Sequence, residues 1–353
     1  MICNGVDRYF IVGIKLEMLN IATLEKYDSQ KMYKIYDKWP DIARESFETE
    51  QKTIDIVNVD HIVFAGMGGS GALSDLMFSI FSKTGIHIDI VKGYLLPKTV
   101  NSKTLVVTIS VSGDTVETLN ILKSAHKIKS RVISFSNGGK IEKYCKKNKL
   151  EFRKVPIYHS PRASFASFLY TMLNVLEPIL PIQKNDIIKS IKKMEQLRDQ
   201  IGSKNINNNN TAFDLAKWIP DVPVIYYPFG LQSAAIRFKN SLQENSKLHV
   251  ISEDIIEASH NGIVPWNNSK KFKPILLRGQ NDFIKTKERW EIIKEFFDEK
   301  DIEYKEIFSV SGNILTKITN LIYFFDYVSI YTANIRKIDP TPTEPIKFIK
   351  KRI

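Results

Sequence analysis

The sequence alternates short apolar, β-branched runs with segments of helical period, and this alternation most constrains its fold. Expected strands are His61–Ala65, Ile86–Val91, Thr104–Ile109, Arg131–Ser136, Val222–Tyr227, Leu248–Ile251, Pro274–Leu277 and Tyr304–Ser309. Expected helices between and after them include Ala72–Ser82, Thr115–Ile128, Leu231–Leu242, Thr286–Glu299 and Ile314–Arg336. Parallel neighbouring strands need crossover helices, so the order predicts an α/β fold with two mostly parallel sheets, each covered by helices on both faces.

A chain of 353 residues exceeds the size at which a single core keeps growing, so we expect two domains. The expected division is an N-terminal helical segment at 1–49, one α/β domain at 50–182, a helix and linker at 183–210, and a second domain at 211–353. Residues 202–210 read GSKNINNNN, which predicts an exposed loop too polar to pack. Residues 1–17 lack the basic region and cleavage site of a signal peptide and are a candidate start-site extension.

Composition excludes several classes of protein. Hydrophobic residues at 43% and charged residues at 25% are ordinary globular values, and no apolar run reaches the roughly 20 residues of a membrane span. The two cysteines, Cys3 and Cys145, lie far apart and form no metal-ligand spacing, which favours a reducing cytoplasm and neither a metal nor a disulfide framework. A net charge of +12 attracts anions, but the C-terminal lysine cluster has no interleaved aromatic residues, so we expect no nucleic-acid partner.

The first expected strand leads directly into Gly66–Gly71, which contains Gly68, Gly69 and Ser70, and then into a helix. Glycines allow close backbone approach, and a helix N-terminus presents N–H groups to an anion. The same residues match G-x-G-x-x-G, with Asp89 near the position of a ribose-binding acid, so a nicotinamide-dependent dehydrogenase is an alternative on this loop alone. A tight turn without a ligand is the other alternative.

The third expected strand ends in a second loop with hydroxyl side chains. Ser110, Ser112 and Thr115 surround Gly113 at the start of the next helix. Three hydroxyls and the backbone N–H groups of one turn suit a phosphate monoester better than a dinucleotide, whose adenine needs a flat slot. A capped helix start without a ligand is the alternative interpretation of this motif.

The two loops together resemble the signature of the sugar isomerase (SIS) domain. Later segments are similar to archaeal-type bifunctional phosphoglucose/phosphomannose isomerases, namely Pro161–Ala163, Gln243–Lys247, His260–Asn261 and the tail from Asp339–Pro342 to Lys350. The resemblance implies two SIS-type domains and interconversion of glucose 6-phosphate and mannose 6-phosphate with fructose 6-phosphate through a cis-enediol(ate). It implies no cofactor and no metal.

The resemblance also implies a role for individual residues. Glu244 corresponds to the base that moves the carbon-bound proton, and Arg162 to the cation that stabilises the enediolate. His260 corresponds to a ring-opening histidine contributed by the neighbouring subunit, which implies an obligate homodimer. Lys350 corresponds to a lysine near the ring oxygen, and Thr343 is the candidate for the small hydroxyl residue that admits mannose 6-phosphate.

The sequence departs from the family pattern at Asp114, where asparagine is usual, and at Gly262, where an acid is usual. An acid beside a phosphate loop is unfavourable, so we expect Asp114 to point outward. Thr341 is a second candidate for the hydroxyl role in the tail.

Two other functions stay open for this sequence, a non-catalytic sugar-phosphate-binding SIS regulator and an amino-sugar phosphate isomerase.

Overall fold

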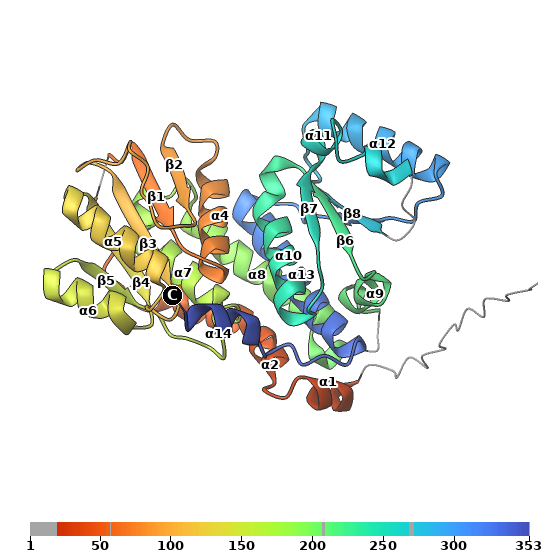
Figure 1. Ribbon diagram of the computed structural model, residues 1–353, viewed down its shortest axis with the longest axis horizontal. Coiled ribbons are helices and arrows are strands. Elements are labelled where there is room, and N and C mark those ends of the chain that lie inside the picture. Colours follow the sequence, from red (N-terminus) through yellow and green to blue (C-terminus); the bar gives the residue numbers. More distant parts are fainter. Residues whose placement is uncertain (1–19, 57, 207–208, 268–271, 353) are drawn as a thin grey trace, which may run out of the picture.

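The alternation predicted from the sequence folds into two parallel β-sheets (Figure 1). The computed structural model describes residues 20–56, 58–206, 209–267 and 272–352. The candidate start-site extension at 1–17, with Cys3, lies outside the described residues. Within those ranges no helix combines the length and the apolar character needed to cross a bilayer.

The first sheet has the strand order β2-β1-β3-β4-β5, and all its strands are parallel. The strands are β1 (His61–Ala65), β2 (His87–Val91), β3 (Leu105–Ser110), β4 (Arg131–Ser136) and β5 (Glu151–Lys154). The helices that cover it are α4 (Gly69–Phe81), α5 (Val116–Ile128), α6 (Gly139–Asn148) and α7 (Phe165–Val175). Ile62 and Phe64 pack with α4 and α7, whereas Val63 and Val106 pack with α5 and α6, so both faces are covered.

The second sheet has the order β7-β6-β8-β9 and repeats the topology of the first with one strand fewer. Its strands are β6 (Pro223–Tyr227), β7 (Ile251–Asp254), β8 (Lys273–Arg278) and β9 (Lys305–Phe308). Its helices are α10 (Gln232–Asn245), α11 (Ile255–Ala258), α12 (Ile284–Glu299) and α13 (Ile314–Ile335). Val224 packs with Trp290 of α12, and Ile225 packs in the core that contains α10 and α13. The predicted fold class is therefore confirmed.

One strand was predicted at the wrong residues and another was not predicted. Residues 248–250 are not in a strand, because Lys247 adopts the left-handed conformation (φ 58°) and the Leu248 N–H closes back on the Leu242 carbonyl. Leu248 is thus folded back toward the end of α10 and buried, and the strand begins only at Ile251. Strand β5 was not predicted, because its sequence EFRK has three charged residues and no apolar run.

The asparagine-rich segment packs more than its polarity suggests. Ser203, Ile206 and Asn210 are buried, which contradicts the prediction of a loop too polar to pack. Asn210 accepts the Phe213 N–H at the start of α9 (Thr211–Trp218) and donates to the Ile201 carbonyl. Its polar groups are therefore satisfied inside the protein, which is what allows their burial.

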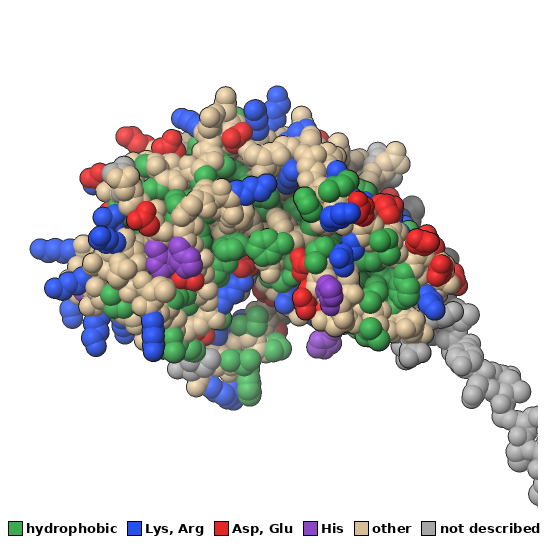
Figure 2. Space-filling view, turned by 90° about the horizontal axis from the view of Figure 1, so that it is seen from above, with side chains coloured by type: hydrophobic (Ala, Val, Ile, Leu, Met, Phe, Trp, Pro, Cys, Tyr) green, Lys and Arg blue, Asp and Glu red, His purple; other side chains and the backbone are tan. Residues whose placement is uncertain are grey.

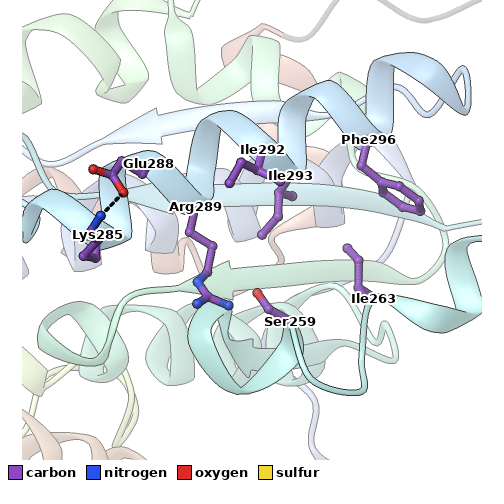
Figure 3. Close-up of a pocket in the computed structure, with 8 residues that line it drawn as sticks. All are labelled: Ser259, Ile263, Lys285, Glu288, Arg289, Ile292, Ile293 and Phe296. Atoms are coloured by element: carbon purple, nitrogen blue, oxygen red, sulfur yellow. Dashed lines mark hydrogen bonds and ion pairs between the residues drawn. The ribbon is translucent and has the colours of Figure 1, made fainter.

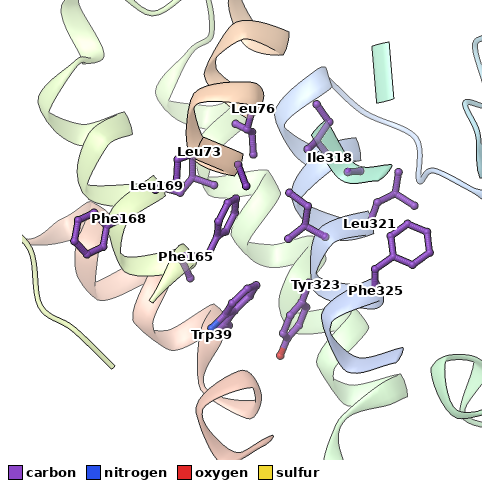
Figure 4. Close-up of a cluster of buried hydrophobic side chains, with 14 of the residues drawn as sticks. Trp39, Leu73, Leu76, Phe165, Phe168, Leu169, Ile318, Leu321, Tyr323 and Phe325 are labelled. Atoms are coloured by element: carbon purple, nitrogen blue, oxygen red, sulfur yellow. The ribbon is translucent and has the colours of Figure 1, made fainter. Parts of the chain in front are cut away.

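A helical core joins the two sheets (Figure 4). The remaining helices are α1 (Ile21–Tyr27), α2 (Met32–Asp37), α3 (Trp39–Glu48), α8 (Lys184–Ile201) and α14 (Glu344–Lys350). Trp39 of α3 stacks between Phe165 of α7 and Tyr323 of α13, at centroid distances of 5.9 and 5.6 Å. Its indole N–H donates to the Ala163 carbonyl at 2.7 Å. Side chains from both halves thus share one apolar interior.

We expect Trp39→Ala to lower the free energy of unfolding by about 3–5 kcal/mol, because it removes a buried aromatic side chain and leaves a cavity. Urea unfolding followed by circular dichroism measures the change. Phe283→Ala removes an aromatic side chain that is 72% exposed, and it should cost less than about 0.5 kcal/mol. Equal losses in the two variants would contradict the central place of Trp39 in the core.

Candidate active site

The candidate active site lies where the strand order of the first sheet reverses. From β1 the chain moves to β2 on one side and then crosses to β3 on the other. In open parallel sheets ligands bind in the crevice at the carboxyl ends of two such strands. The loop Gly66–Gly71 follows β1 and the loop Val111–Thr115 follows β3, so the two predicted phosphate loops meet at this crevice.

Each loop depends on a glycine with positive φ. Gly68, with φ 55°, is the residue that precedes α4, and a side chain there would be strained. Gly113, with φ 76°, lies so close to the next loop that an added Cβ would be 1.8 Å from the Gly138 carbonyl oxygen. Both turns lead directly into the 13-residue helices α4 and α5, whose N-termini carry partial positive charge.

The three predicted hydroxyls differ in position. Ser110 is buried, its Oγ lies 2.8 Å from Thr115 Oγ1, and it accepts the Gly113 N–H. Ser112 is exposed and Thr115 is half-buried at the start of α5. Ser110 thus stabilises the loop through its hydrogen bonds, while Ser112 and Thr115 line a cavity.

That cavity has a volume of about 320 Å³. Nine of the residues predicted from the sequence line it, namely Gly68, Gly69, Ser70, Ser112, Thr115, Arg162, Glu244, Thr343 and Lys350. Ser110 and His260 are not among its lining residues. The structure therefore brings together, from both halves of the chain, nearly all the residues singled out for binding and proton transfer.

Arg162 lies at the centre of the polar contacts of this cavity. The residue is 5% exposed, and its guanidinium donates from Nε to Asn245 Oδ1 at 2.7 Å and from Nη1 to Glu244 Oε2 at 3.2 Å. Nη2 donates to the backbone carbonyls of Pro340 and Thr341. The cation is therefore held at a fixed place, with the carboxylate of Glu244 directly beside it.

A second buried ion pair supports the first. Arg237 of α10 donates to both carboxylate oxygens of Asp326 on α13, and both side chains are almost fully buried. Arg237 Nη2 also donates to the Arg162 carbonyl at 2.8 Å. The hydroxyl of Ser241 donates to the same carboxylate. This network fixes the backbone that carries Arg162.

The C-terminal tail supplies the remaining wall. It crosses from α13 toward the first sheet (Figure 1), and α14 lines a cavity together with Thr115 and Glu117 at the start of α5. Thr343 and Lys350 reach the cavity from this segment, together with Ile346. No residue of α14 is buried. A neighbouring cavity of about 670 Å³ shares Gly68, Glu244 and Thr343 with the first, which extends the space beside the carboxylate.

His260 lies elsewhere in this chain. It is exposed in the turn after α11, and its N–H donates to the Glu257 carbonyl. The adjacent residue Ser259 lines a different cavity of about 470 Å³ between α11 and α12 (Figure 3). Four apolar and four polar or charged residues line that cavity, and its Lys285 is paired with Glu288 at 2.7 Å. It does not contain the two phosphate loops.

The two departures from the family pattern have local explanations. Asp114 is exposed, and its Oδ1 accepts the Lys140 N–H in the first turn of α6 at 3.0 Å, so the carboxylate serves a neighbouring helix start. A Cβ at Gly262 would lie 2.2 Å from Glu253 Oε2. A carboxylate from β7 therefore occupies the space next to Gly262. Burial and the nearby carboxylates of Glu257 and Asp254 raise the pKa of Glu253.

Some contacts of the site were not inferred from the sequence. Asn245 orients Arg162 and is itself anchored, since its amide donates to Ser329 Oγ. Lys247 Nζ donates to the carbonyls of Glu244 and Pro340 and so holds the tail against α10. Burial, and next the Arg162 charge, lower the pKa of Lys247. Asn245 and Lys247 belong to the motif Gln243–Lys247, and this membership was the sequence feature that could have indicated their place in the site.

Several solved structures have the same architecture as this chain, and some of them are described as phosphosugar isomerases. A putative phosphosugar isomerase from Bacillus subtilis superposes with a TM-score of 0.63 over 89% of this chain and 97% of its own, at 14% identity. The chain has the two-domain SIS fold. A hypothetical protein from Thermus thermophilus superposes on this fold with a TM-score of 0.68, over 94% of this chain and 89% of its own, at 12% identity.

Sequence comparison extends the likeness of this SIS-fold chain along most of its length. Residues 208–353 match the family described as the C-terminal SIS domain of bacterial phospho-glucose isomerase. A bifunctional phosphoglucose/phosphomannose isomerase from Caldicellulosiruptor bescii is 29% identical, over 84% of this chain and 90% of its own. The corresponding protein from Aquifex aeolicus is 26% identical, over 92% and 98%. The resemblance inferred from the motifs is therefore confirmed.

We expect Asp326→Asn to lower the free energy of unfolding by about 3–5 kcal/mol, because it leaves the buried Arg237 guanidinium without a counter-charge. Asp221→Asn, at an exposed pair with Arg336, should cost less than about 1 kcal/mol. Urea titration of both variants distinguishes the buried pair from the surface pair. A small loss in Asp326→Asn would show that Arg237 does not depend on this carboxylate.

Proposed function

We propose that this protein is an aldose-ketose isomerase that interconverts glucose 6-phosphate and mannose 6-phosphate with fructose 6-phosphate. One observation carries the proposal. The Glu244 carboxylate and the Arg162 guanidinium are 3.2 Å apart in a cavity that is also lined by the N-terminal residues of α4 and α5. A base, a fixed cation and an anion site thus occur together.

The phosphate of the substrate binds at the loops after β1 and β3. There the N-terminal ends of α4 and α5 offer N–H groups and partial positive charge, and Ser112 and Thr115 offer hydroxyl donors. Binding of the dianion places the sugar carbons toward Glu244, because the cavity extends in that direction.

Proton transfer is assigned to Glu244. The carboxylate removes a proton from C2 of the open-chain aldose and returns it to C1, while the hydroxyl proton passes from O2 to O1; the ketose reacts by the reverse steps. The enediolate formed in between carries negative charge on its oxygens, and the adjacent Arg162 stabilises that charge. Because Arg162 is already oriented by Asn245 and two carbonyls, little reorganisation is needed when the charge develops.

The remaining assignments complete the reaction. His260 of a second copy of the chain opens the sugar ring, so the active form is a homodimer. The enzyme acts in the cytoplasm. Lys350 contacts the substrate near the ring oxygen. Thr343 lies between the two cavities, where a small side chain leaves room for rotation about C2–C3 of the enediolate and so for mannose 6-phosphate.

The proposed isomerisation is tested with coupled assays run separately on fructose 6-phosphate and mannose 6-phosphate, without added metal or nicotinamide in the isomerase step. We expect turnover of both substrates and a loss of at least about 100-fold in kcat for Glu244→Gln, with substrate affinity retained. Glu288→Gln, in the cavity between α11 and α12, is the matched control and should keep full activity.

Unchanged kcat in Glu244→Gln would overturn the base assignment.

A D-glucosamine-6-phosphate 4-epimerase from Sulfolobus acidocaldarius is also similar to this chain, at 23% identity over 70% of it. Glucosamine 6-phosphate is therefore included as a third substrate. Activity on it alone would replace the proposed hexose-phosphate reaction with one on an amino sugar. Binding without turnover of any of the three would favour a sugar-phosphate sensor.

The contribution of His260 across a dimer interface is tested by co-expression of two inactive variants. Glu244→Gln and His260→Ala should each be inactive alone, and a mixed dimer contains one site with neither change. Random pairing therefore restores about a quarter of wild-type activity. Co-expression of Glu244→Gln with Arg162→Met is the control. Each active site takes both of these residues from the same chain, so every site of a mixed dimer contains one of the two changes. Recovery no greater than in that control would show that His260 does not act across an interface.

A further inference from the structure

A cluster of metal-ligating side chains lies at the opposite end of the first sheet from the phosphate loops. Strands β1 and β2 both begin with histidine, and the parallel register pairs His61 with His87. Asp89 follows His87 by two residues, so its side chain emerges on the same face as the two histidines. Figure 2 shows histidine side chains at the surface of the half that contains this sheet.

The distances within this cluster suit a shared ion. Asp89 Oδ2 lies 2.9 Å from His61 Nε2 and 3.4 Å from His87 Nε2. One ligand atom from each residue lies within 4.8 Å of the other two. Ligands of tetrahedral zinc, each about 2 Å from the ion, are about 3.3 Å apart. His87 has a side chain that is 62% exposed, so its ring has room to turn toward a bound ion.

The surroundings of His61 support coordination through its Nε2. Its other ring nitrogen, Nδ1, lies 3.2 Å from the hydroxyl of the buried Thr104. That hydroxyl also accepts the Asn101 N–H at 3.1 Å. In the metal-free protein the Nε2 N–H donates to the Asp89 carboxylate. When an ion takes the place of that proton, the N–H moves to Nδ1 and is donated to the Thr104 hydroxyl, as behind other metal-bound histidines.

We propose that His61, His87 and Asp89 bind a divalent transition metal of the Zn²⁺ type, with water in the fourth position. Two imidazoles and one carboxylate are a ligand set that zinc accepts. His61 lies about 16 Å along the chain direction of β1 from Gly66, the first residue of the phosphate loop, given five steps of about 3.3 Å each. The effect of the ion is structural, because it ties the edge strand β2 to β1 and does not reach the cavity of the isomerase site.

The test is calorimetric titration of Zn²⁺ into chelator-treated, full-length protein without a histidine tag. We expect one equivalent to bind, and binding to raise the thermal unfolding temperature. His87→Ala and Asp89→Asn should each weaken the affinity at least about tenfold. His126→Ala, which removes the histidine that contacts Tyr144 between α5 and α6, is the matched control and should bind as the wild type does.

His87→Cys retains a zinc ligand and should restore binding lost in His87→Ala, which separates a lost ligand from a damaged fold. The absence of binding by the wild-type protein would overturn the proposal. Equal affinity in the wild type, His87→Ala and Asp89→Asn would overturn it as well, and would leave the three side chains as a hydrogen-bonded network only. These outcomes do not depend on isomerase activity.

Discussion

The contacts of the Arg162 guanidinium are the interaction on which the rest of the site depends. It emerges from the loop before α7 in the N-terminal half, yet its partners are Glu244 and Asn245 of α10 and the carbonyls of Pro340 and Thr341. A buried cation is tolerated only when its N–H groups are satisfied. Those partners must therefore stay together, which joins the two halves and the tail at one point.

The same requirement explains the layers beneath the site. Arg237 holds the backbone of Arg162 and is neutralised by Asp326 on α13, the long helix in the shared interior. Trp39 in turn donates to the carbonyl of Ala163, the residue after Arg162. Core packing thus helps to determine where Arg162 and Glu244 lie, because hydrogen bonds from Trp39 and Arg237 hold the carbonyls of Ala163 and Arg162.

Much of the fold and part of the site could be predicted from the sequence. The phosphate loops were accessible because each is a continuous segment between a strand and a helix, and topology alone brings the ends of β1 and β3 together. The partners of Arg162 were not accessible, since the carbonyls it binds carry no side-chain signal and lie 178 and 179 residues away. Strand β7 was misplaced by a single left-handed residue, Lys247, whose conformation no local pattern indicates. The pairing of His61 with His87 likewise depends on strand register.

The tail helix α14 has a consequence for how the enzyme would release what it makes. None of its side chains is buried, although it carries Lys350 and ends the chain beside the phosphate loops. Its position is therefore maintained by polar contacts near its start and by whatever occupies the cavity, and hardly by apolar packing. Under the proposed function, an element attached in this way would move aside at small energetic cost when the dianion departs, so the same few contacts would set both the affinity for the sugar phosphate and the opening of its exit.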